Sequence, residues 1–328
     1  MTTARFVPLG LVLAAALASA AEPADPWTRI FPDAGEKPAL VFPDEISTGD
    51  DESHPTLAPD GRTFFYLKNT PSFDFYTIIY STWQDGHWSK PQTVPFSGQY
   101  PDGDLVFTPD GTRAYFVSAR PVNGEPREDT EIWTIERTAG GWGEPEHVAE
   151  LSSPGYEWFP TLTADGTMYF GSSREGGLGG HDIWRSHQVD GVWQPPENVG
   201  APVNSPGEEI EALVTPDESM LVFAAKNRGD AIGAYDLYIA RRDGDGWAEP
   251  VHPGSPLNSK GWEFSPRLSP GGALFFFTSS RGFGSDPLKY RLTFDALVER
   301  IRSPGNGLRD IYVMDAAALR ALAEPSGH

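Results

Sequence analysis

Five acidic residues recur at intervals of 50, 55, 52 and 54 residues. They are the main candidates in this sequence for binding or catalysis. We call them the leading acids, because each one begins a repeated motif: Glu52, Asp102, Glu157, Glu209 and Glu263. Carboxylates gathered at one place repel one another, so they require a cation, raised pKa values or basic partners. Ca²⁺ would suit such a cluster because it accepts several oxygen ligands in loose geometry. The sequence indicates no other cofactor.

Further side chains accompany the leading acids. Asp104 and Glu211 follow their leading acids by two residues, which places them on the same face of a regular strand. Trp158 and Trp262 each flank a leading acid, and aromatic rings beside carboxylates are typical of sugar-binding clefts, with plain packing as the alternative. The candidate site for a ligand or cation therefore comprises Glu52, His54, Asp102, Asp104, Glu157, Glu209, Glu211, Glu263, Trp158 and Trp262.

Basic residues recur with the acids. Four arginines lie in the loop after the second strand of their repeats, which we expect on the same face of the propeller as the leading acids: Arg120, Arg174, Arg228 and Arg281. This pattern favours structural ion pairs over a ligand site, and a ligand site over catalytic carboxylates. The first repeat has Thr70 where Arg is expected, so Glu52 should be the least neutralised acid. If one leading acid is functional, we expect it to be Glu52, acting with His54 and Asp102.

The elements that must position these residues form a repeat of about 50 residues. One copy reads DGDLVFTPDGTRAYFVSAR from Asp102, followed by EIWTIERTAGGWGEPEHV. Pro-Asp-Gly and Asp-Gly turns suit tight hairpins because Asp and Gly tolerate positive φ. Four antiparallel strands per repeat are typical of β-propeller blades. Five copies are recognisable, so we expect an all-β fold with a single propeller of five four-stranded blades; the alternative is six blades.

The fifth copy lacks its last strand, and the segment before the first copy can supply it. KPALVFPDEISTGDDESHP, from Lys37, matches the end of other copies, so we expect this N-terminal strand to close the last blade and remove open edges. The predicted organisation is a signal peptide over 1–21, a linker over 22–36, the propeller over 37–319 with an insertion at 285–309, and a C-terminal tail over 320–328.

The run of Pro-Asp-Gly turns, aromatic strands, Ser-x-Arg and Asp-Ile-Tyr resembles the TolB-like, WD-repeat-like β-propeller family of bacterial envelopes, over residues 37–319. The first copy departs from the pattern, with Thr77 where Asp is expected. The resemblance implies the propeller fold. It implies no catalytic residue, because propellers host binding, scaffolding and hydrolase functions alike.

The insertion in the last repeat contains LTFDALVERIRS from Leu292, whose apolar spacing predicts a short amphipathic helix. Its loop should lie on the face of the leading acids. We expect it to cover the channel mouth as a lid or to serve as a docking surface, because long loops are often functional.

The N-terminus and the composition indicate an exported protein. Arg5, the apolar run FVPLGLVLAAALA and Ala-Ser-Ala have the order of a cleavable signal peptide. The chain has no Cys, which excludes disulfides, thiolate catalysis and a lipid anchor on Cys. Its net charge of −21 disfavours nucleic acid and anionic lipid. We expect a periplasmic or secreted monomer with no membrane span.

Two functions remain open from the sequence. The favoured one is a non-enzymatic binding or scaffold propeller of the cell envelope, whose partner at the acidic channel mouth is a protein, a cation or an envelope glycan. The alternative is a glycoside hydrolase that uses two carboxylates from different blades.

Overall fold

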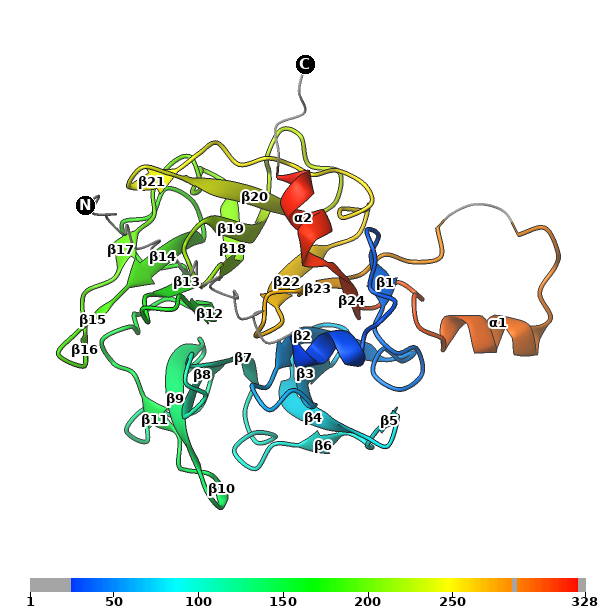
Figure 1. Ribbon diagram of the computed structural model, residues 1–328, viewed down its shortest axis with the longest axis horizontal. Helices are drawn as coiled ribbons and strands as arrows, with labels where there is room; N and C mark the ends of the chain where they lie inside the picture. Colours follow the sequence, from blue (N-terminus) through cyan, green and yellow to red (C-terminus); the bar gives the residue numbers. More distant parts are fainter. Residues whose placement is uncertain (1–24, 285–287, 324–328) are drawn as a thin grey trace, which may run out of the picture.

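The computed structural model describes residues 25–284 and 288–323, which form five antiparallel sheets arranged as blades around a ring (Figure 1). The predicted all-β class and five-bladed propeller are confirmed. The segment expected to be a signal peptide lies outside the described residues. Within the described ranges, the helices are all too short or too polar to cross a membrane.

In each blade the strands follow one another outward from the channel. Blade one contains β2 (Asp51–Leu57), β3 (Thr63–Asn69), β4 (Tyr76–Gln84) and β6 (Gln92–Thr93), with β5 (His87–Trp88) beside β4. Blade two contains β7 (Asp102–Phe107), β8 (Arg113–Ser118), β9 (Glu131–Thr138) and β11 (Glu146–His147), with β10 (Gly141–Trp142) beside β9. Blade three contains β12 (Glu157–Leu162), β13 (Met168–Ser172), β14 (Asp182–Ser186) and β17 (Glu197–Asn198), with a small hairpin of β15 (Gln188–Val189) and β16 (Val192–Trp193).

The last two blades complete the ring. Blade four contains β18 (Glu208–Val214), β19 (Met220–Lys226), β20 (Asp236–Asp243) and β21 (Gly246–Trp247). Blade five contains β22 (Glu263–Leu268), β23 (Leu274–Ser279), β24 (Asp310–Asp315) and β1 (Ala39–Leu40). In this blade Ala39 pairs with Val313 and Leu40 with Tyr312, so the two ends of the propeller chain lie in one sheet.

Both terminal segments of the described residues pack against the blades. The 3₁₀ helix η1 (Pro26–Arg29) buries Trp27 completely, and this indole packs against Phe64 and Trp88. Helix α2 (Ala316–Leu322) continues directly from β24 and buries Leu319. These segments carry large apolar side chains, whose burial stabilises the folded state by about 1.5–3 kcal/mol each.

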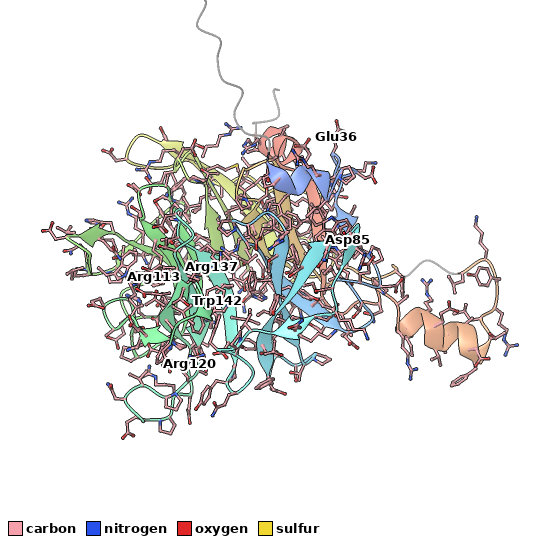
Figure 2. All side chains as sticks on the ribbon, turned by 60° about the horizontal axis from the view of Figure 1, so that its bottom comes forward. Glu36, Asp85, Arg113, Arg120, Arg137 and Trp142 are labelled. Carbon is pink, nitrogen blue, oxygen red and sulfur yellow. The ribbon has the colours of Figure 1, made fainter. Side chains whose placement is uncertain are left out.

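The insertion forms helix α1 (Phe294–Ile301), which the Thr293 hydroxyl caps by accepting a hydrogen bond from the backbone N–H of Ala296. In both overall views α1 stands beside the ring rather than over the channel (Figures 1 and 2). None of its residues is buried. The expectation of a lid is therefore wrong, because the helix lies beside the ring and none of its residues is buried against the channel mouth.

Apolar side chains from the second strand of every blade fill the space between neighbouring blades. One repeat position, two residues before the residue that pairs with the leading acid, is at most 2 % exposed in all five copies: Tyr66, Phe116, Phe170, Phe223 and Phe277. This shared core fixes the inner strands, and therefore the positions of the side chains that face the channel.

Candidate functional site

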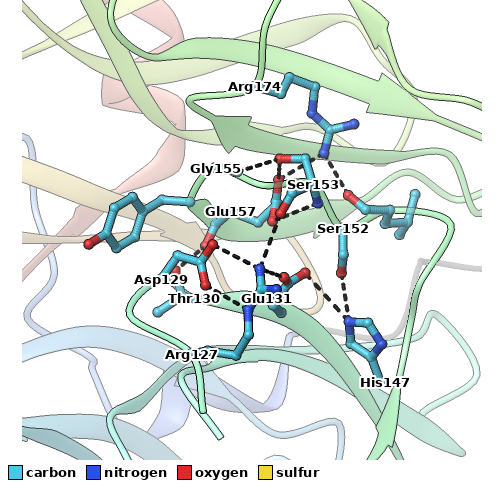
Figure 3. Close-up of polar contacts among 12 residues, drawn as sticks. Arg127, Asp129, Thr130, Glu131, His147, Ser152, Ser153, Gly155, Glu157 and Arg174 are labelled. Carbon is cyan, nitrogen blue, oxygen red and sulfur yellow. Dashed lines mark hydrogen bonds and ion pairs between the residues drawn. The ribbon is translucent and has the colours of Figure 1, made fainter. Parts of the chain in front are cut away.

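Glu157 lies in a buried network of polar contacts and is closed to solvent (Figure 3). Its Oε1 accepts hydrogen bonds from Nη2 of Arg174 at 3.0 Å and from the Ser153 hydroxyl at 2.5 Å. Arg174 in turn stacks over the Phe170 ring at 5.0 Å, which fixes the guanidinium. Burial raises the pKa of Glu157 to about 7, although Ser153 and Arg174 act to lower it. The Glu157 carboxylate therefore belongs to a buried structural network of polar contacts.

The other leading acids are paired in the same way, and every one is 0 % exposed. The arginine pairs are Asp102–Arg120 at 2.9 Å, Glu209–Arg228 at 3.0 Å and Glu263–Arg281 at 3.5 Å. In blade one, Lys68 of β3 pairs with Glu52 instead. The expectation that Glu52 is the least neutralised acid is therefore wrong, because the missing Arg is replaced by a Lys from the adjacent strand.

A sequence signal for this pairing exists four residues before each leading Glu. A hydroxyl there donates to the carboxylate, as does the backbone N–H of the same residue: Thr48, Ser153, Ser205 and Ser259. The hydroxyls and basic side chains contact the four leading Glu carboxylates, whereas Oδ2 of Asp102 is buried without a hydrogen-bond partner among the described residues. All five carboxyls are fully buried, so they are not available to a ligand at the channel mouth.

The residues two positions after the leading acids face the channel. Each has a positive φ of 49° to 58°, and they are His54, Asp104, Phe159, Glu211 and Ser265. The strand register shifts at this point in every blade, which marks a β-bulge. The bulge breaks the alternation of side chains, so Asp104 and Glu211 do not share the environment of their leading acids, contrary to the expectation from a regular strand.

Three of these channel residues meet. Nε2 of His54 lies 3.3 Å from Oδ1 of Asp104 and 3.4 Å from Oε1 of Glu211. The other oxygen of Asp104 accepts a hydrogen bond from the backbone N–H of Phe159 at 2.9 Å. The other oxygen of Glu211 accepts from the backbone N–H and the hydroxyl of Ser265, at 2.7 and 2.8 Å. Blades one, two and four thus bring an imidazole and two carboxylates together.

Arg267 lies next to this cluster and was missed by the sequence analysis. It is 5 % exposed, its guanidinium lies 4.0 Å from the centre of the Phe159 ring, and its Nη1 donates to the backbone oxygen of Pro160 at 3.3 Å. The signal was a break in the repeat, since the corresponding positions of the other blades hold uncharged residues: Thr56, Val106, Thr161 and Leu213.

The buried charges change one another's pKa values. Burial is the largest influence on His54 and acts to lower its pKa, but Glu211 and Asp104 together raise it above its usual value. Burial raises the pKa of Asp104, against the influence of His54 and Arg267. Burial also lowers the pKa of Arg267 to about 10. A carboxyl whose pKa is raised by burial beside specific charged partners is typical of catalytic sites.

The cluster forms part of the wall of a pocket of about 380 Å³. Its lining includes Trp158 and Trp262, both predicted, and Lys226, His181 and Tyr235, which the sequence analysis did not assign to the site. Trp262 is 45 % exposed and Trp158 is half-buried. The predicted residues that come together here are His54, Asp104, Glu211, Trp158 and Trp262.

No cluster of three or more His, Asp or Glu side chains with the arrangement of a metal site occurs in residues 25–284 and 288–323. The chain itself has no Cys.

Comparisons with known proteins find similarity in the fold alone. No protein-family model and no curated protein matches the sequence. A solved structure described as a glycoside hydrolase is 9 % identical over 93 % of this chain and 97 % of its own, with a TM-score of 0.52. The GH62 α-L-arabinofuranosidase catalytic domain of Coprinopsis cinerea is 11 % identical over 86 % of this chain and 98 % of its own, with a TM-score of 0.49. The chain spans 41 % of a Mycobacterium tuberculosis puromycin-hydrolyzing peptidase, at 11 % identity over 79 % of this chain and a TM-score of 0.41.

These findings correct the favoured functional prediction. A non-enzymatic binding or scaffold propeller was expected, yet the fold is shared along almost its whole length with a glycoside hydrolase. The structure adds an observation in the same direction: within the described residues, the ion pairs of Asp104 and Glu211 are with His54, and not with an Arg or Lys as for the leading acids. Both findings agree better with the alternative.

Proposed function

We propose that this protein is a carbohydrate-active hydrolase whose carboxylate pair is Asp104 and Glu211. The observation that carries the proposal is the contact of both carboxylates with one nitrogen of His54, in the wall of a pocket that also contains Trp158 and Trp262. Glycoside hydrolysis requires two carboxyl groups on either side of one bond.

The environments of the two carboxyls suggest separate roles. Glu211 accepts two hydrogen bonds from Ser265, which fix the orientation of its carboxylate and suit a nucleophile or base. The raised pKa of Asp104 suits the general acid. Asp104 would protonate the glycosidic oxygen as its bond to the anomeric carbon breaks, while Glu211 attacks that carbon. Water, deprotonated by Asp104, would then release the sugar from Glu211.

The spacing of the pair favours retention of configuration. Both oxygens lie within 3.4 Å of the same nitrogen, so they cannot be further apart than these two contacts together. This limit includes the roughly 5–5.5 Å separation of retaining enzymes, whose second carboxylate acts as nucleophile, and excludes most of the roughly 6.5–9.5 Å range of inverting enzymes. His54 contacts both carboxylates and acts as a positioning residue.

The experiment is a reducing-sugar assay of the purified protein against arabinan, xylan, cellulose and pectin. We expect release from at least one of them, and a loss of about 10²–10⁴-fold in Glu211→Gln and Asp104→Asn. Glu136→Gln, which changes an exposed carboxylate far from the pocket, is the matched control. Equal activity in all three variants, or no release by folded wild-type protein, would contradict the proposal.

The location of the activity is part of the same proposal. The apolar N-terminal segment with Ala-Ser-Ala supports export, and a periplasmic or extracellular enzyme would meet glycans there. N-terminal sequencing of the protein recovered from cells tests this, since a mature chain beginning near residue 21 is expected. Recovery of the intact N-terminus from the cytoplasm would contradict export.

A further inference from the structure

Three side chains converge on one oxygen of Glu208. Its Oε2 lies 2.7 Å from Nζ of Lys226, accepts a hydrogen bond from the Tyr235 hydroxyl at 2.7 Å and lies 3.3 Å from Nδ1 of His181. His181 precedes β14 in blade three, whereas the others belong to blade four. Glu208 therefore ties two blades together at the edge of the pocket.

Two of these partners also support the tryptophans of the pocket. The His181 ring packs edge-on against Trp158 with centroids 4.6 Å apart, and Tyr235 packs against Trp262 at 5.5 Å. Tyr156 stacks on Trp158 at 5.0 Å with an angle of 5° between the rings. Glu208 thus links the two indoles through His181 and Tyr235, and it sets where each indole lies relative to the other.

The same carboxylate neutralises the cations of the pocket. Burial acts to raise the pKa of Glu208, but hydrogen bonds from Lys226, Tyr235 and His181 lower it below its usual value. His54, the remaining basic residue of the described lining, contacts Asp104 and Glu211. Every basic side chain in this lining is therefore already in contact with a carboxylate.

We infer that the pocket binds an uncharged oligosaccharide across two tryptophan platforms, with Glu208 as the residue that positions them. This inference rests on the proposed function of the same pocket. Uncharged sugars present apolar C–H faces to aromatic rings. An acidic sugar would meet Asp104 and Glu211 without a free cation to pair with, which costs binding free energy.

The experiment measures binding by isothermal titration calorimetry in Glu211→Gln, so that hydrolysis does not consume the ligand. The probes are xylohexaose, arabinohexaose and cellohexaose, compared with hexagalacturonate. We expect at least one neutral probe to bind, and hexagalacturonate to bind at least about tenfold more weakly. No binding of any neutral probe by folded protein, or preferred binding of hexagalacturonate, would overturn the inference.

A second substitution separates positioning from general stability. In Glu211→Gln/Glu208→Gln, Lys226 loses its charged partner and the platforms lose their anchor. We therefore expect the neutral probe to bind about tenfold more weakly and hexagalacturonate to bind more tightly. Glu211→Gln/Glu197→Gln, which changes an exposed carboxylate outside the pocket, should match Glu211→Gln alone. A simple loss of folding would weaken both probes, so changes in the same direction contradict the assignment of Glu208.

The two proposals fail in different ways. If the binding pattern appears but the wild-type protein cleaves no glycan, the hydrolase proposal is wrong and the neutral-saccharide site stands. If the wild-type protein cleaves a glycan but Glu211→Gln/Glu208→Gln keeps the preference of Glu211→Gln between neutral and acidic probes, the inference about Glu208 is wrong.

Discussion

Nε2 of His54 lies 3.3 Å from a carboxylate oxygen of Asp104, and the same nitrogen lies 3.4 Å from Glu211. One imidazole from blade one thus connects carboxylates from blades two and four. Because His54 is only 7 % exposed, water does little to screen these contacts. The protonation state of this histidine is therefore coupled to both proposed catalytic groups.

The first prediction concerns the titration of His54. Asp104, Glu211, Arg267 and Asp51 are the charged groups that act on it, and the two nearest carboxylates raise its pKa. Its ¹H NMR signal, assigned by its loss in His54→Gln, should titrate with a pKa above the usual value of about 6.5. Asp104→Asn and Glu211→Gln should each lower that midpoint. A midpoint below 6.5 in the wild-type protein would contradict the coupling.

The sign of the stability effect follows from the same shift. A histidine whose folded-state pKa is raised contributes stability that is fully present below its unfolded pKa. That contribution is lost as the pH rises through the folded pKa. Urea unfolding should therefore reveal a decline in the stability contributed by His54 between about pH 6.5 and its NMR midpoint.

The second prediction concerns Arg267. Its charge lowers the pKa of Asp104, so Arg267→Met should raise that pKa. If Asp104 is the general acid, the alkaline limb of the pH–activity profile should move to higher pH. Arg267→Lys should move the limb less than Arg267→Met does, because a buried Lys keeps its charge less firmly than Arg but can still carry it. If the alkaline limb of Arg267→Met lies at the wild-type pH, the titration of Asp104 does not determine this limb.

The third prediction separates structural from catalytic carboxylates. Glu157→Gln leaves Arg174 buried without its charged partner, so the free energy of unfolding at pH 8 should fall by about 3 kcal/mol. Glu136→Gln breaks a pair whose carboxylate is 61 % exposed and should cost less than about 1 kcal/mol. Chemical denaturation measures both. A Glu157→Gln protein of unchanged stability but no activity would return Glu157 to the candidate catalytic groups.

The sequence predicts the ring of blades because the repeat is visible in the turns and strands themselves. It also names all the carboxylates of the channel, since Asp104 and Glu211 stand at a fixed distance from their leading acids. The sequence cannot resolve which of these acids lack an ion pair with Arg or Lys. That depends on a β-bulge at one residue per blade and on Lys68, which reaches Glu52 from a neighbouring strand. Neither follows from strand periodicity.

Other parts of the site depend on contacts between blades. Glu208 meets His181 only because the end of one blade lies beside the start of the next. Arg267 was recognisable as a break in the repeat, but its approach to Phe159 and Pro160 requires the closed ring. The predicted lid failed for the opposite reason, since an amphipathic pattern predicts a helix without specifying what its apolar face contacts.

The last prediction concerns helix α1. The side chains of Phe294, Leu297 and Ile301 are 78, 43 and 56 % exposed, and the helix stands beside the ring (Figure 1). Replacing all three by Ser should change the free energy of unfolding by no more than about 0.5 kcal/mol per site and leave hydrolysis unchanged. Leu319→Ser, at a fully buried position of α2, should instead be strongly destabilising. Urea unfolding measures the stability of both variants, and the reducing-sugar assay measures their hydrolysis. Lost activity in a stable α1 variant would mean that the helix contacts the substrate.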